Sequence, residues 1–293
     1  MVIPSLKYDL CMWTKNGERW LSHVMKRIDE VIPSENVNHK ILVDDKSVDQ
    51  TVEIAKDFNW VIYDNPRGGI SAAANEALRH IETEAFISFE QDLLLSRDWF
   101  NQIPPLLDKE DVAVASGVHY ETQPRGIRLL WKRRATQFAE NAQLRDQRIY
   151  HLGMSLDNTI WKTKVVKCVG GFPQLKTLVG FDVLFSHILH YHGWKWVVDY
   201  TVISDHLRTG LRDALKHRDY SRFSYWEIWS QIKRLTKEKP VAKKDVLIRL
   251  FLCVPIGAYL ALKLRESTIG YIYPIERFVI VNSLLKSGAF LRF

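Results

Sequence analysis

The chain has 293 residues, of which 46% are hydrophobic and 26% are charged. This is an ordinary globular composition, sufficient for one large domain or one domain with an appendage, and it contains no repeat or low-complexity tract. The three cysteines, Cys11, Cys168 and Cys253, lie far apart and suggest neither a disulfide framework nor a metal-ligand pair. We therefore expect a reducing compartment, the cytoplasm, and no secretory signal.

The net charge of +7 conceals an asymmetry between two parts of the chain. Residues 1–120 carry 12 Lys and Arg against 20 Asp and Glu, a balance of −8, whereas residues 121–293 carry 29 against 14, a balance of +15. A basic part of this size favours an anionic partner such as nucleic acid, a membrane surface or a phosphorylated substrate. The sequence has no recognisable nucleic-acid-binding motif, so we expect no nucleic-acid partner.

The spacing of apolar residues predicts alternating strands and helices in the first part of the chain. Strands are expected at 8–13, 40–43, 60–63 and 86–89, and helices at 18–32, 51–58 and 70–81. This alternation implies a parallel α/β sheet, in which ligands bind at the carboxyl ends of the strands. Further along, we expect a strand at 112–118, a basic helix at 125–148, a helix at 183–192 and a strand at 194–198.

Acidic residues gather where these strands end. Glu90 and Asp92 follow the strand at 86–89, and alternate residues of an extended chain point the same way, so both carboxylates can face one ion. Oxygen ligands of this kind suit Mg²⁺ or Mn²⁺. The Asp44–Asp45 pair and Arg67 fall at two other strand ends. A common sheet edge favours a ligand site over the alternative of solvated or helix-capping acids.

Two segments carry a family resemblance. Residues 43–51 read VDDKSVDQT and resemble the V-D-D-x-S-x-D-x-T motif of the GT-A nucleotide-diphosphosugar glycosyltransferases of family 2, which include dolichol-phosphate mannose synthases. Residues 65–75, NPRGGISAAAN, resemble a second motif of that family, and the likeness extends over about residues 8–210. Glu90-Gln91-Asp92 stands in the place of the family's D-x-D metal motif.

The resemblance implies specific roles. Asp182 stands where the family has its catalytic base, and Asp92 and His206 stand where it holds Mg²⁺ or Mn²⁺. We assign a lipid-linked or glycan acceptor to the basic stretch, through Arg128, Arg133 and Arg134. The residues expected to bind a UDP- or GDP-linked sugar donor are Thr14, Asp44, Asp45, Arg67, Gly68, Gly69, Asn75, Glu90 and Gln91.

Three positions depart from the family pattern. Glu90 replaces the first Asp of the metal motif, Phe181 replaces the acid before the catalytic base, and Ala74 stands where an Arg is common. The metal site therefore has fewer carboxylates than usual. An inactive homologue that serves as a scaffold stays open as an alternative to an enzyme.

Residues 211–293 lie outside the likeness and carry 16 Lys and Arg against 7 Asp and Glu. The segments 246–264 and 269–293 are apolar and aromatic, but Arg249 and Pro255 interrupt the first of them. We expect amphipathic helices at the membrane interface rather than membrane spans. The alternative is that these helices pack on the catalytic domain or on a second subunit.

The sequence thus predicts a GT-A domain over residues 1–210 and a basic helical region over 211–293. The expected activity is inverting, metal-dependent transfer of a sugar to a polyprenyl-phosphate or other lipid-linked acceptor, at the cytoplasmic face of the membrane. Transfer to a soluble glycan or protein is the alternative within enzymes.

Overall fold

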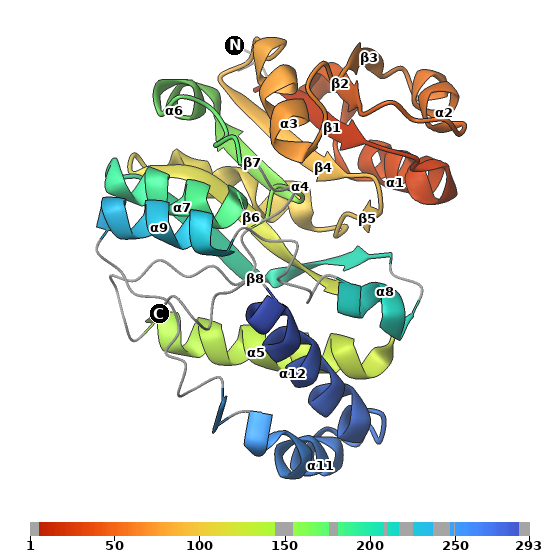
Figure 1. Ribbon diagram of the computed structural model, residues 1–293. Helices are drawn as coiled ribbons and strands as arrows, with labels where there is room; N and C mark the ends of the chain where they lie inside the picture. Colours follow the sequence, from red (N-terminus) through yellow and green to blue (C-terminus); the bar gives the residue numbers. More distant parts are fainter. Residues whose placement is uncertain are drawn as a thin grey trace. The chain divides into compact units, whose positions relative to one another are not determined.

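A computed structural model describes residues 6–143, 155–175, 181–207, 210–216, 225–236, 247–248 and 250–286. The chain divides into two compact units (Figure 1). The first unit comprises Met1–His119, Ile149–Gln174 and Phe181–Leu207, and the second comprises Tyr120–Arg148, Leu175–Gly180 and Arg208–Phe293.

The first unit is built on an eight-stranded sheet with the order β3-β2-β1-β4-β7-β6-β8-β5. Strands β1 to β4 are parallel, whereas β7 runs antiparallel to both β4 and β6, and β5 runs antiparallel to β8. The strands are β1 Tyr8–Thr14, β2 Val37–Asp44, β3 Val61–Asp64, β4 Ala85–Glu90, β5 Leu93–Leu94, β6 Val112–Glu121, β7 Thr159–Lys162 and β8 Lys195–His206.

Helices cover the sheet of the first unit. Helix α1 is amphipathic, and its residues Leu21, Val24 and Ile28 are buried at the spacing of one helical face. From β1 through β2 to β3 the chain moves toward one edge of the sheet, and from β3 to β4 it moves back toward the other edge. Because such crossovers are right-handed, α3, which connects β3 to β4, lies on the face opposite α1 and α2. The helices are α1 Glu18–Val31, α2 Thr51–Asp57, α3 Ile70–Arg79, α4 Trp99–Gln102, α6 Thr163–Cys168 and α7 Phe181–Tyr191, with 3₁₀ turns at Ser34–Asn36 and Pro104–Asp108.

The α/β class predicted from the sequence is confirmed, and the first four strands are parallel as expected. The far edge of the sheet is antiparallel and differs from the expectation in two respects. The strand expected at 194–198 is the start of a much longer strand, β8. The short strands β5 and β7 were not predicted, because two or four residues carry too little periodicity to stand out from loops.

The second unit is helical. Its helices are α5 Arg125–Gln143, α8 Leu211–Lys216, α9 Tyr225–Thr236, α11 Cys253–Leu264 and α12 Ile269–Lys286. Helices α11 and α12 approach closely at Gly257, where a Cβ atom would lie 3.1 Å from the carbonyl oxygen of Gly270. Residues of α5, including Ile127 and Leu130, pack with this pair in a small apolar core.

Many large apolar side chains of the second unit are nevertheless exposed. Phe251 is 82% exposed, Leu262 81% and Phe278 65%. We call the exposed apolar side chains of residues 247–278 the C-terminal apolar surface. Its other members are Leu247, Ile248, Leu252, Val254, Tyr259, Tyr271 and Ile275. Among the residues that the structure describes, no helix combines the length and the hydropathy needed to cross a bilayer.

Candidate active site

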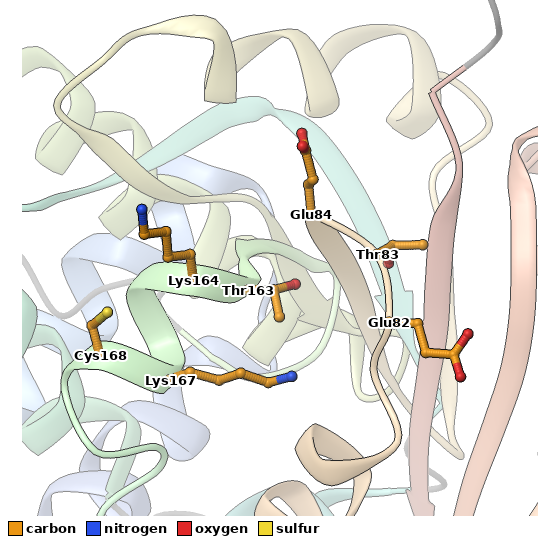
Figure 2. Close-up of a pocket in the computed structure, with 7 residues that line it drawn as sticks. All are labelled: Glu82, Thr83, Glu84, Thr163, Lys164, Lys167 and Cys168. Atoms are coloured by element: carbon orange, nitrogen blue, oxygen red, sulfur yellow. The ribbon is translucent and has the colours of Figure 1, made fainter.

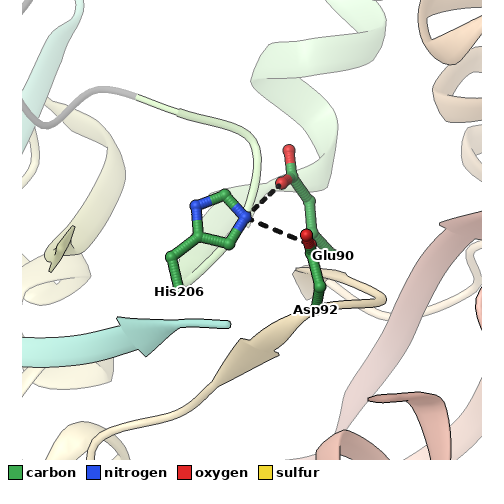
Figure 3. Close-up of side chains that lie close together, drawn as sticks. All are labelled: Glu90, Asp92 and His206. Atoms are coloured by element: carbon green, nitrogen blue, oxygen red, sulfur yellow. Dashed lines mark hydrogen bonds and ion pairs between the residues drawn. The ribbon is translucent and has the colours of Figure 1, made fainter. Parts of the chain in front are cut away.

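Three side chains meet at the carboxyl end of β4. His206 Nε2 lies 3.1 Å from Asp92 Oδ1 and 3.7 Å from Glu90 Oε2 (Figure 3). The His206 side chain is 6% exposed, while the two carboxylates are more accessible, at 30% for Glu90 and 19% for Asp92. The histidine therefore forms the inner wall of the group, and the acids face outward.

Pairing between β5 and β8 brings His206 to this point. Leu93 of β5 lies opposite His206 of β8, and the Leu207 N–H donates to the Asp92 carbonyl at 2.8 Å. The chain turns from β4 into β5 through Gln91 and Asp92, so the same pairing that places the histidine also places the second acid. Sequence spacing alone paired Glu90 with Asp92, and the strand pairing adds the third side chain.

This group fits a divalent cation. One ligand atom from each of the three residues lies within 4.8 Å of the other two. Among the described residues, these three side chains form the group that could hold a metal ion. Two carboxylates and one imidazole suit Mn²⁺, and the oxygens alone suit Mg²⁺. The expected metal residues Asp92 and His206 are therefore together, and Glu90, expected to contact the donor, joins them.

The two acids at the end of β2 differ in their surroundings. Asp44 is buried and accepts hydrogen bonds from the Ser47 N–H at 2.8 Å and the Ser47 hydroxyl at 2.6 Å, with the Thr14 hydroxyl at 3.4 Å. Asp45 faces the loop after β3 and accepts hydrogen bonds from Asn65 Nδ2 at 3.1 Å and the Gly69 N–H at 3.4 Å. Asp44 thus stabilises the turn from Asp44 to Ser47, while Asp45 links the end of β2 to the loop that follows β3.

The loop after β3 requires its glycines. Gly68 and Gly69 have φ angles of +75° and +83°, a region that other residues adopt only with strain. Asn65 Oδ1 accepts a hydrogen bond from the Gly68 N–H at 3.2 Å, which fixes the turn. Arg67, the residue before these glycines, is exposed at the same edge of the sheet.

Two residues expected to bind the donor hold the scaffold together. Gln91 accepts a hydrogen bond from the Lys15 N–H at 2.8 Å and donates to the Lys15 carbonyl at 3.1 Å, which ties the end of β1 to the end of β4. Asn75 accepts from the Phe172 N–H at 2.9 Å and donates to the Phe172 carbonyl at 2.7 Å. Their side-chain amides position neighbouring backbone, and contact with a donor stays a prediction.

Asp182 lies at the start of α7 and accepts a hydrogen bond from the Val183 N–H at 2.8 Å. Burial raises the pKa of its carboxyl group to about 6, and the negative charge of Asp157 acts in the same direction. The Val183 hydrogen bond and His119 lower this pKa, but by less. A carboxylate with this pKa can take up a proton near neutral pH.

Sequence reasoning missed two residues beside this site. His119 Nδ1 lies 3.0 Å from Asp157 Oδ2, and the His119 ring meets the His206 ring edge to face, with centroids 4.9 Å apart. His119 directly follows the strand predicted at 112–118, so the sequence placed it at the end of that strand, which in the structure extends to Glu121. Asp157 precedes the unpredicted strand β7 and had no such signal.

The three arginines assigned to an acceptor lie on α5, in the second unit. Arg134 is engaged there by Glu276, with nitrogen–oxygen distances of 2.6 and 3.2 Å. Arg128 and Arg133 are half-buried. The remainder of the expected basic helix, from residue 144 to residue 148, lies outside the described residues.

A separate cavity of about 460 Å³ opens beside β4 and α6 (Figure 2). Its lining includes Glu82, Thr83 and Glu84, which precede β4, so it lies at the amino end of that strand. Ligands of parallel α/β sheets bind at the opposite, carboxyl ends. The cavity is therefore distinct from the site around Asp92.

The chain belongs to glycosyl transferase family 2, whose sequence model matches residues 9–172. It is therefore a glycosyltransferase by family, and its fold agrees. No curated protein is significantly similar to the chain in sequence.

Three solved structures share this fold at low identity. Mannosyltransferase PcManGT from Pyrobaculum calidifontis, in complex with GDP-Man and Mn²⁺, has a TM-score of 0.64 at 15% identity, over 97% of this chain and 88% of that one. TarS 1-349 from S. aureus, in complex with UDP-GlcNAc, has a TM-score of 0.55 at 16% identity, over 96% and 85%. Glucosyl-3-phosphoglycerate synthase from Mycobacterium tuberculosis, with Mn²⁺, UDP and glucosyl-3-phosphoglycerate, has a TM-score of 0.51 at 12% identity, over 80% and 82%. The GT-A fold expected from the motifs is confirmed.

The raised pKa of Asp182 predicts a pH-dependent cost of burying its charge. The folded-state pKa of about 6 lies above the ordinary aspartate pKa of 3.8, so the stabilisation by the protonated form is complete below about pH 4 and is lost as the pH rises through 6. Asp182→Asn keeps the acceptor for Val183 and removes the charge. At pH 7.5 we expect it to raise the free energy of unfolding by an amount on the order of 2 kcal/mol, and by little at pH 4.

Urea unfolding of both proteins at the two pH values measures this difference. Asp57→Asn, at an exposed acid at the end of α2, is the control and should show no such pH dependence. Equal stability of Asp182→Asn and wild type at pH 7.5 would contradict the burial of this charge.

Proposed function

We propose that this chain transfers a sugar, with inversion, from a UDP- or GDP-linked donor to a lipid-linked acceptor, as the motif likeness to dolichol-phosphate mannose synthases suggests. The observation that carries the proposal is the meeting of Glu90, Asp92 and His206 at the carboxyl end of β4, in the same unit as Asp182 with its raised pKa. The donors GDP-Man and UDP-GlcNAc in the similar structures support the two nucleotide classes.

Asp92, His206 and Glu90 would hold a Mn²⁺ or Mg²⁺ ion, which when bound stabilises the charge that develops on the departing nucleoside diphosphate. Their donor set and their half-buried position at a strand end support this role. The longer side chain of Glu90 still reaches the group, since its Oε2 lies 3.7 Å from His206 Nε2. The substitution of Glu for Asp in the metal motif is therefore compatible with a metal site.

The neighbouring strand ends would hold the nucleotide. Asp45 is half-buried and borders the glycine loop, so its carboxylate can accept hydrogen bonds from a base or a ribose. Arg67 is exposed beside Gly68 and Gly69, where its guanidinium can pair with a diphosphate while the glycines let backbone approach. Asp44, Thr14, Gln91 and Asn75 would support these strand ends through the hydrogen bonds described above.

Asp182 would act as the base. In an inverting transfer the acceptor displaces the nucleotide in one step, and one carboxylate takes the acceptor's proton or, for an acceptor that is already a phosphate, orients it. A pKa of about 6 leaves most of the carboxyl ionised at neutral pH and keeps it a stronger base than an ordinary Asp.

The second unit would bring the acceptor from a membrane surface. The C-terminal apolar surface includes Phe251, Leu262 and Phe278, and residues 211–293 carry an excess of nine positive charges, from 16 Lys and Arg against 7 Asp and Glu. Apolar insertion and attraction to anionic lipids act together in peripheral binding. Arg128 and Arg133, on α5 of the same unit, are the side chains proposed to meet an acceptor phosphate.

We expect Asp92→Ala to abolish transfer and most of the metal-dependent affinity for the donor, because it removes a carboxylate from the metal group. Isothermal titration with UDP and GDP, with and without Mn²⁺, measures the affinity. Asp98→Ala, at an exposed acid nearby, should leave both properties unchanged. Full activity of Asp92→Ala, or of wild type in excess EDTA, would contradict the metal assignment.

Asp182→Asn should lower turnover by roughly 10²- to 10⁴-fold, the usual contribution of a general base, while donor affinity persists. In wild type, kcat/KM should rise as the pH passes through about 6, because the ionised form of Asp182 is the active one. This limb of the pH profile should vanish in the variant. Loss of donor affinity with normal turnover of bound donor would assign the residue to the donor instead.

The membrane proposal predicts co-sedimentation with vesicles of phosphatidylglycerol and phosphatidylcholine, weaker at high salt. The triple variant Phe251→Ser, Leu262→Ser and Phe278→Ser should bind less, because it removes the most exposed apolar side chains. Val48→Ser is the matched control, since Val48 is 91% exposed but lies in the first unit. If the surface instead joins two subunits, size-exclusion chromatography will show a dimer for wild type and a monomer for the triple variant. In that case wild type will not co-sediment with vesicles at any salt concentration.

A further inference from the structure

A buried acid lies beside the proposed metal group without a role in the motifs. The Asp157 side chain is fully buried, and neither of its carboxylate oxygens makes a well-aligned hydrogen bond with the part of the chain that the structure describes. His119 Nδ1 lies 3.0 Å from Asp157 Oδ2. Removing a carboxylate from water is costly unless it has a partner, so the contact with His119 offsets part of the cost of this burial.

The turn that carries Asp157 is held in place by buried hydrogen bonds. Asn158 Nδ2 donates to the Val118 carbonyl at 3.2 Å, next to His119 in β6, and Trp99 Nε1 donates to the Asn158 carbonyl at 3.1 Å. The Thr159 hydroxyl donates to the Asp157 carbonyl at 2.7 Å. The Asp157 carboxylate therefore has a fixed position relative to β6.

β6 and β8 also have a fixed spacing at this point. Gly117 precedes His119 by two residues, and a Cβ atom there would lie 2.7 Å from the Val202 carbonyl of β8. Only glycine allows this approach. As a result the rings of His119 and His206 meet at 4.9 Å with an interplanar angle of 73°, an edge-to-face contact.

We propose that His119, anchored by Asp157, is a positioning residue that fixes the ring of His206 with Nε2 toward Asp92 and Glu90. The inference rests on the proposed metal role of His206. A metal-binding histidine needs contacts outside the metal group that hold its ring in orientation, and loss of hydrogen-bonding partners of this kind typically weakens metal binding by about 10- to 100-fold. Here a ring contact adds to that restraint, and Asp157 keeps the contacting ring in place.

The test is Mn²⁺ affinity, measured by electron paramagnetic resonance of free Mn²⁺ with the full chain, alone and with UDP or GDP. His119→Gln retains a polar neighbour for Asp157 but removes the ring that meets His206, and we expect Mn²⁺ affinity to fall by about 10-fold or more. Asp157→Ala keeps both histidines and removes the anchor together with its charge, and the same direction of change is expected. In activity assays, the Mn²⁺ concentration for half-maximal rate should rise in both variants.

The matched control is His80→Gln. His80 also pairs with an acid, Glu76 at 3.4 Å, and stacks on a ring, Tyr63 at 3.6 Å, but it lies away from the metal group. This variant should bind Mn²⁺ like wild type. Thermal melting followed by circular dichroism shows which variants fold. If one of His119→Gln and Asp157→Ala fails to fold, the Mn²⁺ affinity of the other decides the question.

The outcomes separate the two proposals. Wild-type Mn²⁺ affinity in a folded His119→Gln or Asp157→Ala protein, or an equal loss in His80→Gln, overturns the positioning role and leaves the metal site intact. Failure of the wild-type chain to bind Mn²⁺ under every condition overturns the metal site itself. A purely structural role of the pair would lower the melting temperature while leaving the Mn²⁺ dissociation constant unchanged, which also overturns the inference.

Discussion

The parallel register of β1, β2, β3 and β4 is the constraint on which the site depends. Thr14 lies opposite Asp44, Trp13 opposite Glu90, and Asp44 opposite Asp64, so four strands end at one level. Backbone hydrogen bonds set this alignment, and the buried apolar residues of each strand prevent a slip, because a shift by one residue would turn them to the other face. Polar residues that follow these strands therefore meet at one edge without any direct attraction between them.

The antiparallel strands bring further residues to the site formed at the ends of the parallel strands. β8 pairs with β5 and delivers His206 to the acids that follow β4. β7 and the turn before it bring Asp157 to His119 on β6. The parallel half of the sheet thus carries the residues proposed for the nucleotide, and the antiparallel half carries those proposed to orient the metal group.

Charge burial gives this site its chemistry. Asp182 lies where burial raises its pKa to about 6, and the nearby charges of Asp157 and His119 act on it in opposite directions. The same His119 ring contacts His206. A carboxylate suited to proton transfer and a histidine suited to metal binding therefore share one half-buried neighbour, His119, and a change at His119 reaches both.

The sequence by itself determined the alternating α/β order, the parallel arrangement of the first four strands and the gathering of Asp44, Asp45, Arg67, Glu90 and Asp92 at strand ends, because local periodicity and spacing record these features. It also determined the family, through motif segments that are contiguous in the chain. Only the tertiary structure decided that Gln91 and Asn75 hold backbone, that Glu90 joins His206, and that Asp157 reaches His119. These contacts join residues 38 to 116 positions apart in the chain, through strands of two to four residues or through loops. Such pairings depend on how the whole sheet packs, and no local pattern encodes them.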